Sequence, residues 1–233
     1  MASGFETEIK LGLPDEAAWR WVRERISPVR TVDQTNHFFD RPGRPLARAR
    51  IGVRLRETAE GLRLTVKGPA EGAEDARITR RVELERDRDP KDLVVARSAG
   101  LRLEADLAVW RADAEGDPER TQFLDLLEET TRERPLETIG AFRNERAIGA
   151  LVLRDGTGVL DVEVELDRTR FPGDRTDFEL EVERSSEPDG RLDRTRDALV
   201  RWLDREGGIR TFARESKLAR FEALLEAGET GSR

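Results

Sequence analysis

Charged residues at every second position recur in several short runs of this sequence. Some runs carry carboxylates, as in Glu6-Thr7-Glu8, and others carry cations, as in Arg54-Leu55-Arg56. Carboxylate oxygens favour Mg²⁺, Mn²⁺ or Ca²⁺ over zinc or copper. Arginine binds phosphate oxygens through its planar fork and lysine binds them as a compact point charge. Carboxylates with metal, placed opposite such cations, would make a phosphoryl-transfer site in which positioning and charge neutralisation do most of the catalysis.

The rest of the reactive inventory is small. The chain has no cysteine and one histidine, His37. This excludes disulfides, thiolate ligands, cysteine nucleophiles, histidine-rich metal sites and most catalytic triads. His37 precedes Phe38-Phe39, a setting that favours a strand residue over a catalytic base. Lysine is rare because nearly all basic charge is arginine; the lysines are Lys10, Lys67, Lys91 and Lys217.

Length and composition restrict the class of protein. The chain has 233 residues, of which 39% are charged, and its formal net charge is −7. This acidic balance argues against a general affinity for nucleic acid. No apolar run approaches the roughly 20 residues that a membrane-spanning helix needs. The N-terminus lacks the basic-then-apolar pattern of a secretory signal. We therefore expect a soluble cytoplasmic protein that does not bind membranes.

The charged runs alternate with apolar residues at period two, which is typical of β-strands. Six regular runs and two less regular segments predict eight strands. They span residues 5–11, 34–40, 50–56, 62–67, 81–85, about 138–153, 160–167 and 178–183. Glu60-Gly61 is short enough to join two of them as a hairpin.

The charged faces of these strands have two interpretations. Like charges at i and i+2 repel each other unless water, facing cations or metal compensates them. For a single strand, a charged face that points outward into water explains the pattern as well as one that points inward. An ordinary β-sandwich would have such outer faces. Six such strands favour a closed eight-stranded antiparallel β-barrel with charged sides inward and helices packed outside. The predicted fold class is therefore α+β, mainly β.

Helical patterns lie between the predicted strands. They span residues 14–26, 91–110 with a possible break at Gly100, 117–131, 192–206 and 214–225. Residues 42–45 and 69–76 are expected to be loops, and 227–233 a flexible tail. The insertion at about 87–138 is interpreted as packing, with a binding role as the alternative. The four tryptophans, Trp19, Trp21, Trp110 and Trp202, are also interpreted as packing, with base stacking on a nucleotide as the alternative. Without a clear linker, residues 1–233 are expected to form one domain.

The order of the charged motifs resembles that of the CYTH superfamily, the triphosphate tunnel metalloenzymes. Glu6-Thr7-Glu8-Ile9-Lys10 matches the ExExK signature of that superfamily. The motifs that follow in family order are Asn36-His37-Phe38-Phe39-Asp40, Val53-Arg54-Leu55-Arg56, Leu64-Thr65-Val66-Lys67-Gly68-Pro69, Arg81-Val82-Glu83-Leu84-Glu85, Val164-Glu165-Leu166-Asp167, Glu179-Leu180-Glu181 and Ser216-Lys217-Leu218-Ala219-Arg220. Three of the four lysines fall within these motifs.

The resemblance implies roles for particular residues. The implied metal ligands are Glu6, Glu8, Glu83, Glu85, Glu165, Asp167, Glu179 and Glu181. The implied phosphate contacts are Lys10, Arg54, Arg56, Lys67, Arg143 or Arg146, Lys217 and Arg220. Lys10, Arg56 and Glu165 are the implied catalytic residues. The alternation around 141–146 leaves open which of Arg143 and Arg146 points inward. Glu183 is expected on the same strand face as Glu179 and Glu181, so which two of these glutamates form the functional pair is also open.

The resemblance also implies a reaction, namely hydrolysis of a triphosphate with Mg²⁺ or Mn²⁺. Inorganic triphosphate is the preferred substrate and thiamine triphosphate the second, because the motifs contain no obvious pocket for an organic group. The alternatives are an adenylyl cyclase of the same superfamily, related to class IV, and a non-catalytic module that binds polyphosphate or nucleotide. The expected partner is a small-molecule triphosphate, and the chain is expected to be a monomer or homodimer.

Overall fold

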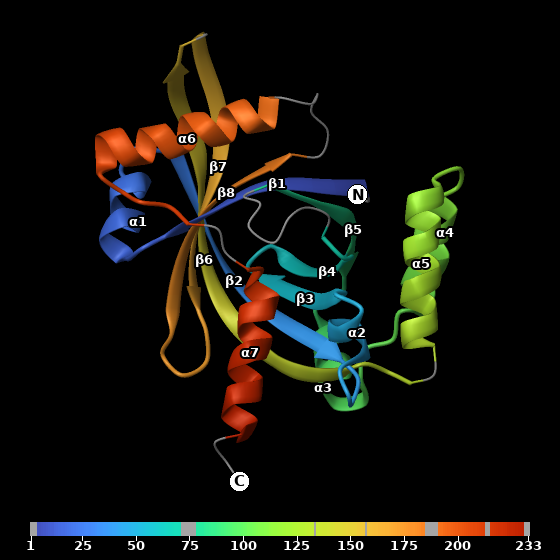
Figure 1. The fold of residues 1–233 in the computed structure, drawn as a ribbon. Coiled ribbons are helices and arrows are strands. Elements are labelled where there is room, and N and C mark those ends of the chain that lie inside the picture. The colour runs from blue at the N-terminus through green and yellow to red at the C-terminus, as the bar shows by residue number, and fades with distance from the viewer. Residues whose placement is uncertain are drawn as a thin grey trace. The chain divides into compact units, whose positions relative to one another are not determined.

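The eight predicted strands are present and form a closed barrel. A computed structural model describes residues 4–70, 78–132, 134–156, 158–184, 191–212 and 215–230. The strands are β1 (Gly4–Leu13), β2 (Ser27–Asp40), β3 (Gly52–Thr58), β4 (Gly61–Lys67), β5 (Ile78–Arg88), β6 (Glu137–Asp155), β7 (Gly158–Arg170) and β8 (Thr176–Arg184) (Figure 1). Their order around the barrel is β1-β5-β4-β3-β2-β6-β7-β8. The closed antiparallel barrel is confirmed, and the alternative of an ordinary sandwich is wrong.

All five predicted helical regions are found. The helices are α1 (Glu16–Arg23), α2 (Pro45–Arg48), α3 (Lys91–Ala99), α4 (Glu104–Asp113), α5 (Pro118–Thr131), α6 (Arg191–Gly207) and α7 (Lys217–Thr230). The break at Gly100 is confirmed, because this residue adopts a φ of 84° and ends α3. A Cβ atom on residue 100 would lie only 2.5 Å from the Cβ of Pro135, so the close approach of Pro135 requires glycine here.

Two local predictions need correction, and a third is not tested beyond residue 70. Residues 42–45 were expected to be a loop, but Pro45 begins the short helix α2. The carboxylate of Asp40 accepts hydrogen bonds from the backbone N–H groups of Leu46 and Ala47, both at 3.1 Å, which satisfies donors at that helix start. The tail expected from residue 227 is helical through Thr230. The loop predicted at 69–76 lies outside the described residues from 71 onward.

The chain divides into two compact units. Unit 1 comprises Met1–Glu6, Gln34–Glu71 and Arg80–Ala141. Its core joins the apolar faces of β3, β4 and β5 to α3, α4 and α5, as in the cluster of Leu55, Leu64, Leu84, Trp110 and Leu124. The 87–138 insertion therefore packs on the sheet, as predicted.

Unit 2 comprises Thr7–Asp33, Gly72–Thr79 and Phe142–Arg233. Its core joins β1, β7 and β8 to α1 and α6, as in the cluster of Ile9, Trp19, Val164, Leu180 and Leu199. Trp21 and Trp202 pack against each other beside this core, with ring centroids 4.8 Å apart. The prediction of one domain over residues 1–233 stays a prediction.

The packing decides which strand face points into the barrel. Val53 and Leu55 of β3 are buried against helices, so the alternate residues Arg54 and Arg56 lie on the opposite face. The same alternation applies to the other strands, because successive side chains of a strand point to opposite faces. The charged rows therefore line the interior of the barrel.

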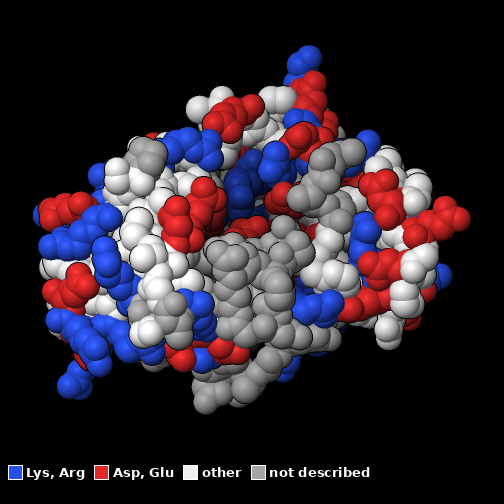
Figure 2. All heavy atoms as spheres, turned by 90° about the horizontal axis from the view of Figure 1, so that it is seen from above, with Lys and Arg blue, Asp and Glu red and all other residues white. Residues whose placement is uncertain are grey.

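Charge is also abundant on the outside. Figure 2 shows acidic and basic side chains interspersed over the described part of one face. Among the described helices, none is long and apolar enough to cross a membrane.

Candidate functional site

In unit 1, a buried glutamate on β1 is held by two cations. The Lys67 ammonium of β4 lies 2.5 Å from Glu6 Oε1 and 3.1 Å from Glu83 Oε1 of β5. The Arg81 guanidinium donates a hydrogen bond of 2.8 Å to Glu6 Oε2. Lys67 and Glu83 are direct partners in the β4–β5 register, so the strand pairing itself places them together. We call Glu6, Lys67, Arg81 and Glu83 the Glu6 cluster.

The cations decide the ionisation of Glu6. Burial by itself would raise the pKa of this carboxyl, because the charged form is poorly solvated. The charges of Lys67 and Arg81 outweigh burial and lower the pKa of Glu6 far below its ordinary value. Glu6 is therefore a carboxylate at neutral pH, as a metal ligand must be.

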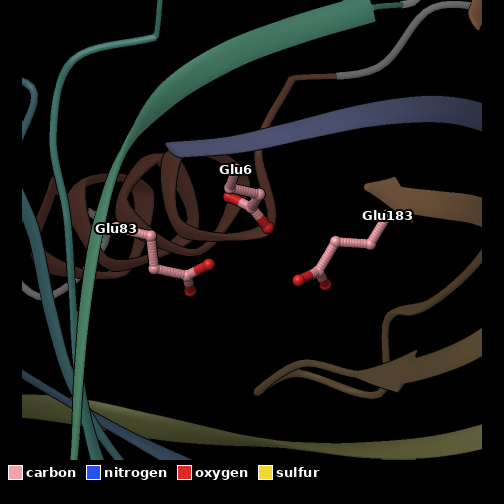
Figure 3. Close-up of side chains that lie close together, drawn as sticks. All are labelled: Glu6, Glu83 and Glu183. Carbon is pink, nitrogen blue, oxygen red and sulfur yellow. The ribbon is translucent and has the colours of Figure 1, made fainter. Parts of the chain in front are cut away.

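Two carboxylates of unit 1 lie together in a way that fits a hard divalent cation. Glu6 and Glu83 each offer an oxygen, and these oxygens lie within 4.8 Å of each other (Figure 3). Glu183 of β8 is the register partner of Glu8, which lies two residues from Glu6 on the same strand face. An all-oxygen donor set fits Mg²⁺ or Mn²⁺. The Lys67 ammonium now bonds both Glu6 and Glu83, so an incoming cation would have to share or displace it.

Other cations and acids of unit 1 line the same strand faces. Glu85 accepts a hydrogen bond of 3.2 Å from the Thr65 hydroxyl and lies 3.5 Å from Arg63. Arg56 donates to the Asn36 amide oxygen at 3.4 Å. The Nε of Arg54 is buried and has no hydrogen-bond partner among the described residues. Arg54 is thus a cation with unused donor capacity on an inward face.

Unit 2 contains a denser set of buried charges, which we call the Asp167 network. Its cations are Lys10, Arg146, Lys217 and Arg220, and its carboxylates are Glu8, Glu165, Asp167, Asp177, Glu179 and Glu181. Strand register brings the carboxylates together, because Glu165 is paired with Glu181 and Asp167 with Glu179. The cations prevent these buried carboxylates from repelling one another.

Arg146 of β6 occupies the centre of this network. It donates a bidentate pair of hydrogen bonds to Asp167, at 2.8 and 2.7 Å, and one of 2.9 Å to Glu181. It also forms an ion pair with Glu165. Asp167 is fully buried and accepts a further bond of 2.9 Å from Asn144. Of the two arginines considered from the sequence, Arg146 lies in the network, whereas Arg143 is exposed.

Lysines from both ends of the chain complete the network. Lys10 lies 3.0 Å from Glu8 and 3.4 Å from Glu181. Lys217, at the start of α7, lies 2.9 Å from Asp167, 2.8 Å from Glu179 and 2.7 Å from Glu181. Lysine at these positions presents a compact charge to several carboxylates at once.

The network fixes the ionisation of Glu181 and Lys10. Burial opposes the charged form of both groups, but the opposite charges outweigh it. The pKa of Glu181 is held well below its ordinary value by Lys217, Lys10 and Arg146, against the effect of burial. The pKa of Lys10 is raised by Glu8 and Glu181, again against burial. Glu181 and Lys10 are therefore charged at neutral pH.

One turn beyond Lys217, Arg220 anchors α7. Its guanidinium donates hydrogen bonds of 2.9 Å to Asp177 and of 2.9 Å to Glu179. Phe221 is fully buried and packs edge-on against Phe142, with ring centroids 5.6 Å apart. Helix α7 is thus tied to the inner carboxylates by two adjacent cations.

The sequence-based site residues divide between the two units. The structure brings Glu6, Lys67 and Glu83 together in one cluster, and Lys10, Arg146, Lys217 and their carboxylates in the other. Every carboxylate proposed for a second metal is bonded to a cation, so such a metal would have to displace one. Their roles in binding or catalysis stay predictions.

Four residues of the charged faces were missed or left aside. Glu183 alternates with Glu179 and Glu181, and this alternation was the signal that could have placed it on the charged face. Arg81 alternates with Glu83 and Glu85 in the same way. Asp177 and Asn144 join the network through Arg220 and Asp167, and the sequence contains no local signal for these pairings.

His37 lies away from these charges as a buried residue of β2. Its Nε2 lies 3.5 Å from Glu57 and its Nδ1 lies 3.0 Å from the Arg97 guanidinium. Burial and the charge of Arg97 lower its pKa, against the opposing effect of Glu57. His37 is thus a buried residue of a strand, as predicted.

Comparison with known proteins agrees with this architecture. The model of the CYTH domain matches residues 4–199. HpAC1 from Hippeastrum, a candidate adenylyl cyclase described with a dominant triphosphatase activity, is 25% identical, covering 94% of this chain and 95% of its own, with a TM-score of 0.67. No curated protein matches the sequence.

Two further solved structures share the fold. A candidate adenylate cyclase from Bacillus halodurans is 17% identical, covering 94% of this chain and 98% of its own, with a TM-score of 0.56. The protein PH1819 from Pyrococcus horikoshii is 18% identical, covering 94% and 99%, with a TM-score of 0.51.

Proposed function

This chain belongs to the CYTH domain family, and from that premise we propose that it is a metal-dependent triphosphatase. The observation that carries the proposal is the oxygen-only pair of Glu6 and Glu83, next to the partly buried cations Lys67 and Arg81. Such an arrangement suits a polyanion that is bound together with a divalent cation. The triphosphatase activity described for HpAC1 supports the same reaction class.

The proposed contacts to substrate use cations on the inner faces. Arg54 has a buried Nε without a partner among the described residues, and a phosphate oxygen would satisfy it. Arg56 and Lys67 lie on the same strand faces and would bind the phosphate chain beside it. Lys10, Arg146, Lys217 and Arg220 already bond carboxylates, so substrate would have to compete with these ion pairs.

A carboxylate is also needed to orient the attacking water. Asp167 is fully buried and holds Arg146 and Lys217, whereas the side chain of Glu165 keeps 19% of its surface exposed. We assign the water-orienting role to Glu165 for that reason. Mg²⁺ or Mn²⁺, when bound, would polarise the phosphate and neutralise the charge that develops on it.

The experiment compares products from several triphosphates. Purified protein is incubated with tripolyphosphate, thiamine triphosphate or ATP, with Mg²⁺ or Mn²⁺, and both phosphate and cyclic AMP are measured. We expect phosphate release, with tripolyphosphate the best substrate and thiamine triphosphate second. Cyclic AMP as the main product from ATP would identify a cyclase instead. Tight binding without any product would identify a binding module.

A variant pair tests the phosphate contact. Arg54→Gln removes the buried donor without a partner, and we expect hydrolysis to fall by about 100-fold, the scale seen when one charge-stabilising donor is lost. Arg201→Gln, at an exposed position of α6, should leave hydrolysis unchanged. Equal activity of the two variants would contradict the assignment of Arg54.

A further inference from the structure

The helical insertion of unit 1 contains a cavity of about 290 Å³. It lies between α4, the C-terminal end of α5 and the bridge that joins Leu101 to Leu136. Small-molecule sites commonly have volumes of about 300–1,000 Å³, so this cavity lies at the lower limit of that range and has room only for a small ligand. The triphosphatase proposal makes no use of it.

The floor of the cavity is apolar and held in place by the backbone. Leu101, Leu103, Leu107 and Leu136 line it and are all buried in the unit 1 core. Leu101 and Leu136 exchange backbone hydrogen bonds of 2.8 Å in each direction. The floor is therefore preformed, and a bound molecule would meet apolar surface there without reorganising the chain.

The rim of the cavity is rich in arginine. Arg102 pairs with Glu104 at 3.1 Å. Arg111 pairs with Glu128 at 2.5 Å and with Asp125 at 2.8 Å. Arg132 and Arg134 also line the cavity, and neither has an ion pair within the part of the chain that the structure describes. The described lining thus has four arginines and two glutamates beside an apolar floor.

The start of α4 lies at the same rim, and its first turn also carries Glu104 and Asp106. Leu103 occupies the N-cap position and provides no side-chain hydrogen bond to the first turn. The first N–H groups of a helix carry partial positive charge, and an anion near them is stabilised. Leu103 and Glu104 both line the cavity, so this helix end belongs to it.

We propose that this cavity binds a small organic anion with an apolar body and one acidic group. The apolar body lies on the leucine floor, and the acidic group lies toward Arg132, Arg134 and the start of α4. A triphosphate lacks the apolar body, so this site is separate from the one proposed for hydrolysis. Its binding is measurable without any triphosphate present.

The test uses octanoate as the anionic probe and 1-octanol as the uncharged one. Binding to the full chain is followed by NMR of leucine methyl groups, with Leu103 and Leu107 as reporters. We expect octanoate to shift these signals and to bind at least about tenfold more tightly than 1-octanol, because only octanoate gains from the arginines. Arg134→Gln should remove most of that difference, whereas Arg201→Gln should not.

A second pair of variants locates the site. Ala108 is exposed on α4 and lines the cavity, so Ala108→Leu fills its mouth without touching the core. Ala105 is exposed on the same helix outside the lining, and Ala105→Leu is the matched control. We expect octanoate binding to be lost in the first variant and kept in the second.

Several results would overturn the proposal. They are the absence of octanoate binding, equal binding of octanoate and 1-octanol, and binding that survives Ala108→Leu. Shifts of Leu103 and Leu107 that appear on raising the protein concentration alone would identify a second copy of the chain as the occupant.

Discussion

Buried charge dominates the molecule at the scale of single residues. Asp167 bonds Arg146, Lys217 and Asn144 and has no exposed surface. Removing one partner of a buried ion pair leaves an uncompensated charge, which typically costs about 3–5 kcal/mol. The inner carboxylates thus hold the barrel interior together in addition to any role in catalysis.

This predicts a large effect on stability for Asp167→Asn. The substitution keeps the size of the side chain and removes the charge that compensates Arg146 and Lys217. We expect the free energy of unfolding in urea to fall by about 3 kcal/mol. Asp161→Asn, at an exposed position of the same strand face, is the control and should change it by less than about 0.5 kcal/mol. Similar losses in both variants would contradict the account.

The lowered pKa of His37 predicts a dependence of stability on pH. The unfolded chain binds a proton near the ordinary histidine pKa of 6.5, whereas folded His37 binds it only at lower pH. As the pH falls below about 6.5, the unfolded state gains the proton first, so this contribution to stability is lost. It is fully present above that pH.

The measurement compares urea unfolding of the protein and of His37→Gln between neutral pH and about pH 5, the range in which histidine titrates. We expect the original chain to lose more stability than the variant over this range. Parallel curves for the two proteins would show that His37 contributes nothing to the pH dependence.

At the scale of elements, the strands were the most predictable part of the fold. Alternation at period two is a local property of the chain, and it identified all eight strands. Helix α2 was missed because its start depends on Asp40, which belongs to the preceding strand. A helix of this length has too little periodicity to be recognised from its own residues.

The pairings within the site were less predictable than its residues. Local alternation and the family resemblance identified Lys10, Asp167 and Lys217, but not which carboxylate each cation bonds. Those bonds depend on strand register and on where α7 packs, and they join residues far apart in the sequence, such as Lys217 and Glu181. Arg143 and Arg146 could be distinguished only once the β6–β7 register was known.

Helix α7 gives a prediction at this scale. Arg220 is buried and bonds Asp177 and Glu179. Arg220→Met removes this anchor and leaves Glu179 paired with Lys217 and Asp177 paired with Arg175, so local opening of α7 should become easier. We expect the amide hydrogens of α7 to exchange at least about tenfold faster, which corresponds to about 1.4 kcal/mol.

The matched control is Arg201→Met, at an exposed position of α6. It should leave the exchange of α7 unchanged. Unchanged exchange of α7 in Arg220→Met would instead show that Phe221 and the other apolar contacts hold the helix without the ion pairs.

At the scale of the whole molecule, the closed barrel explains why so much charge is buried. Closure of the strands removes their edges and turns one face of every strand inward. The outer faces bury apolar residues against helices, so the inner faces carry the charge. A chain with these faces gains a polar interior that suits a small polyanion better than an apolar ligand.

The central claim is that this interior hydrolyses triphosphate with a metal held by Glu6 and its neighbours. The most direct measurement is phosphate release from tripolyphosphate, with and without Mg²⁺ or Mn²⁺, by the original chain and by Glu83→Gln. We predict metal-dependent release by the original chain and a loss of about 100-fold in the variant, on the scale of other lost charge-stabilising groups. Release that needs no metal, or that Glu83→Gln leaves unchanged, would contradict the account.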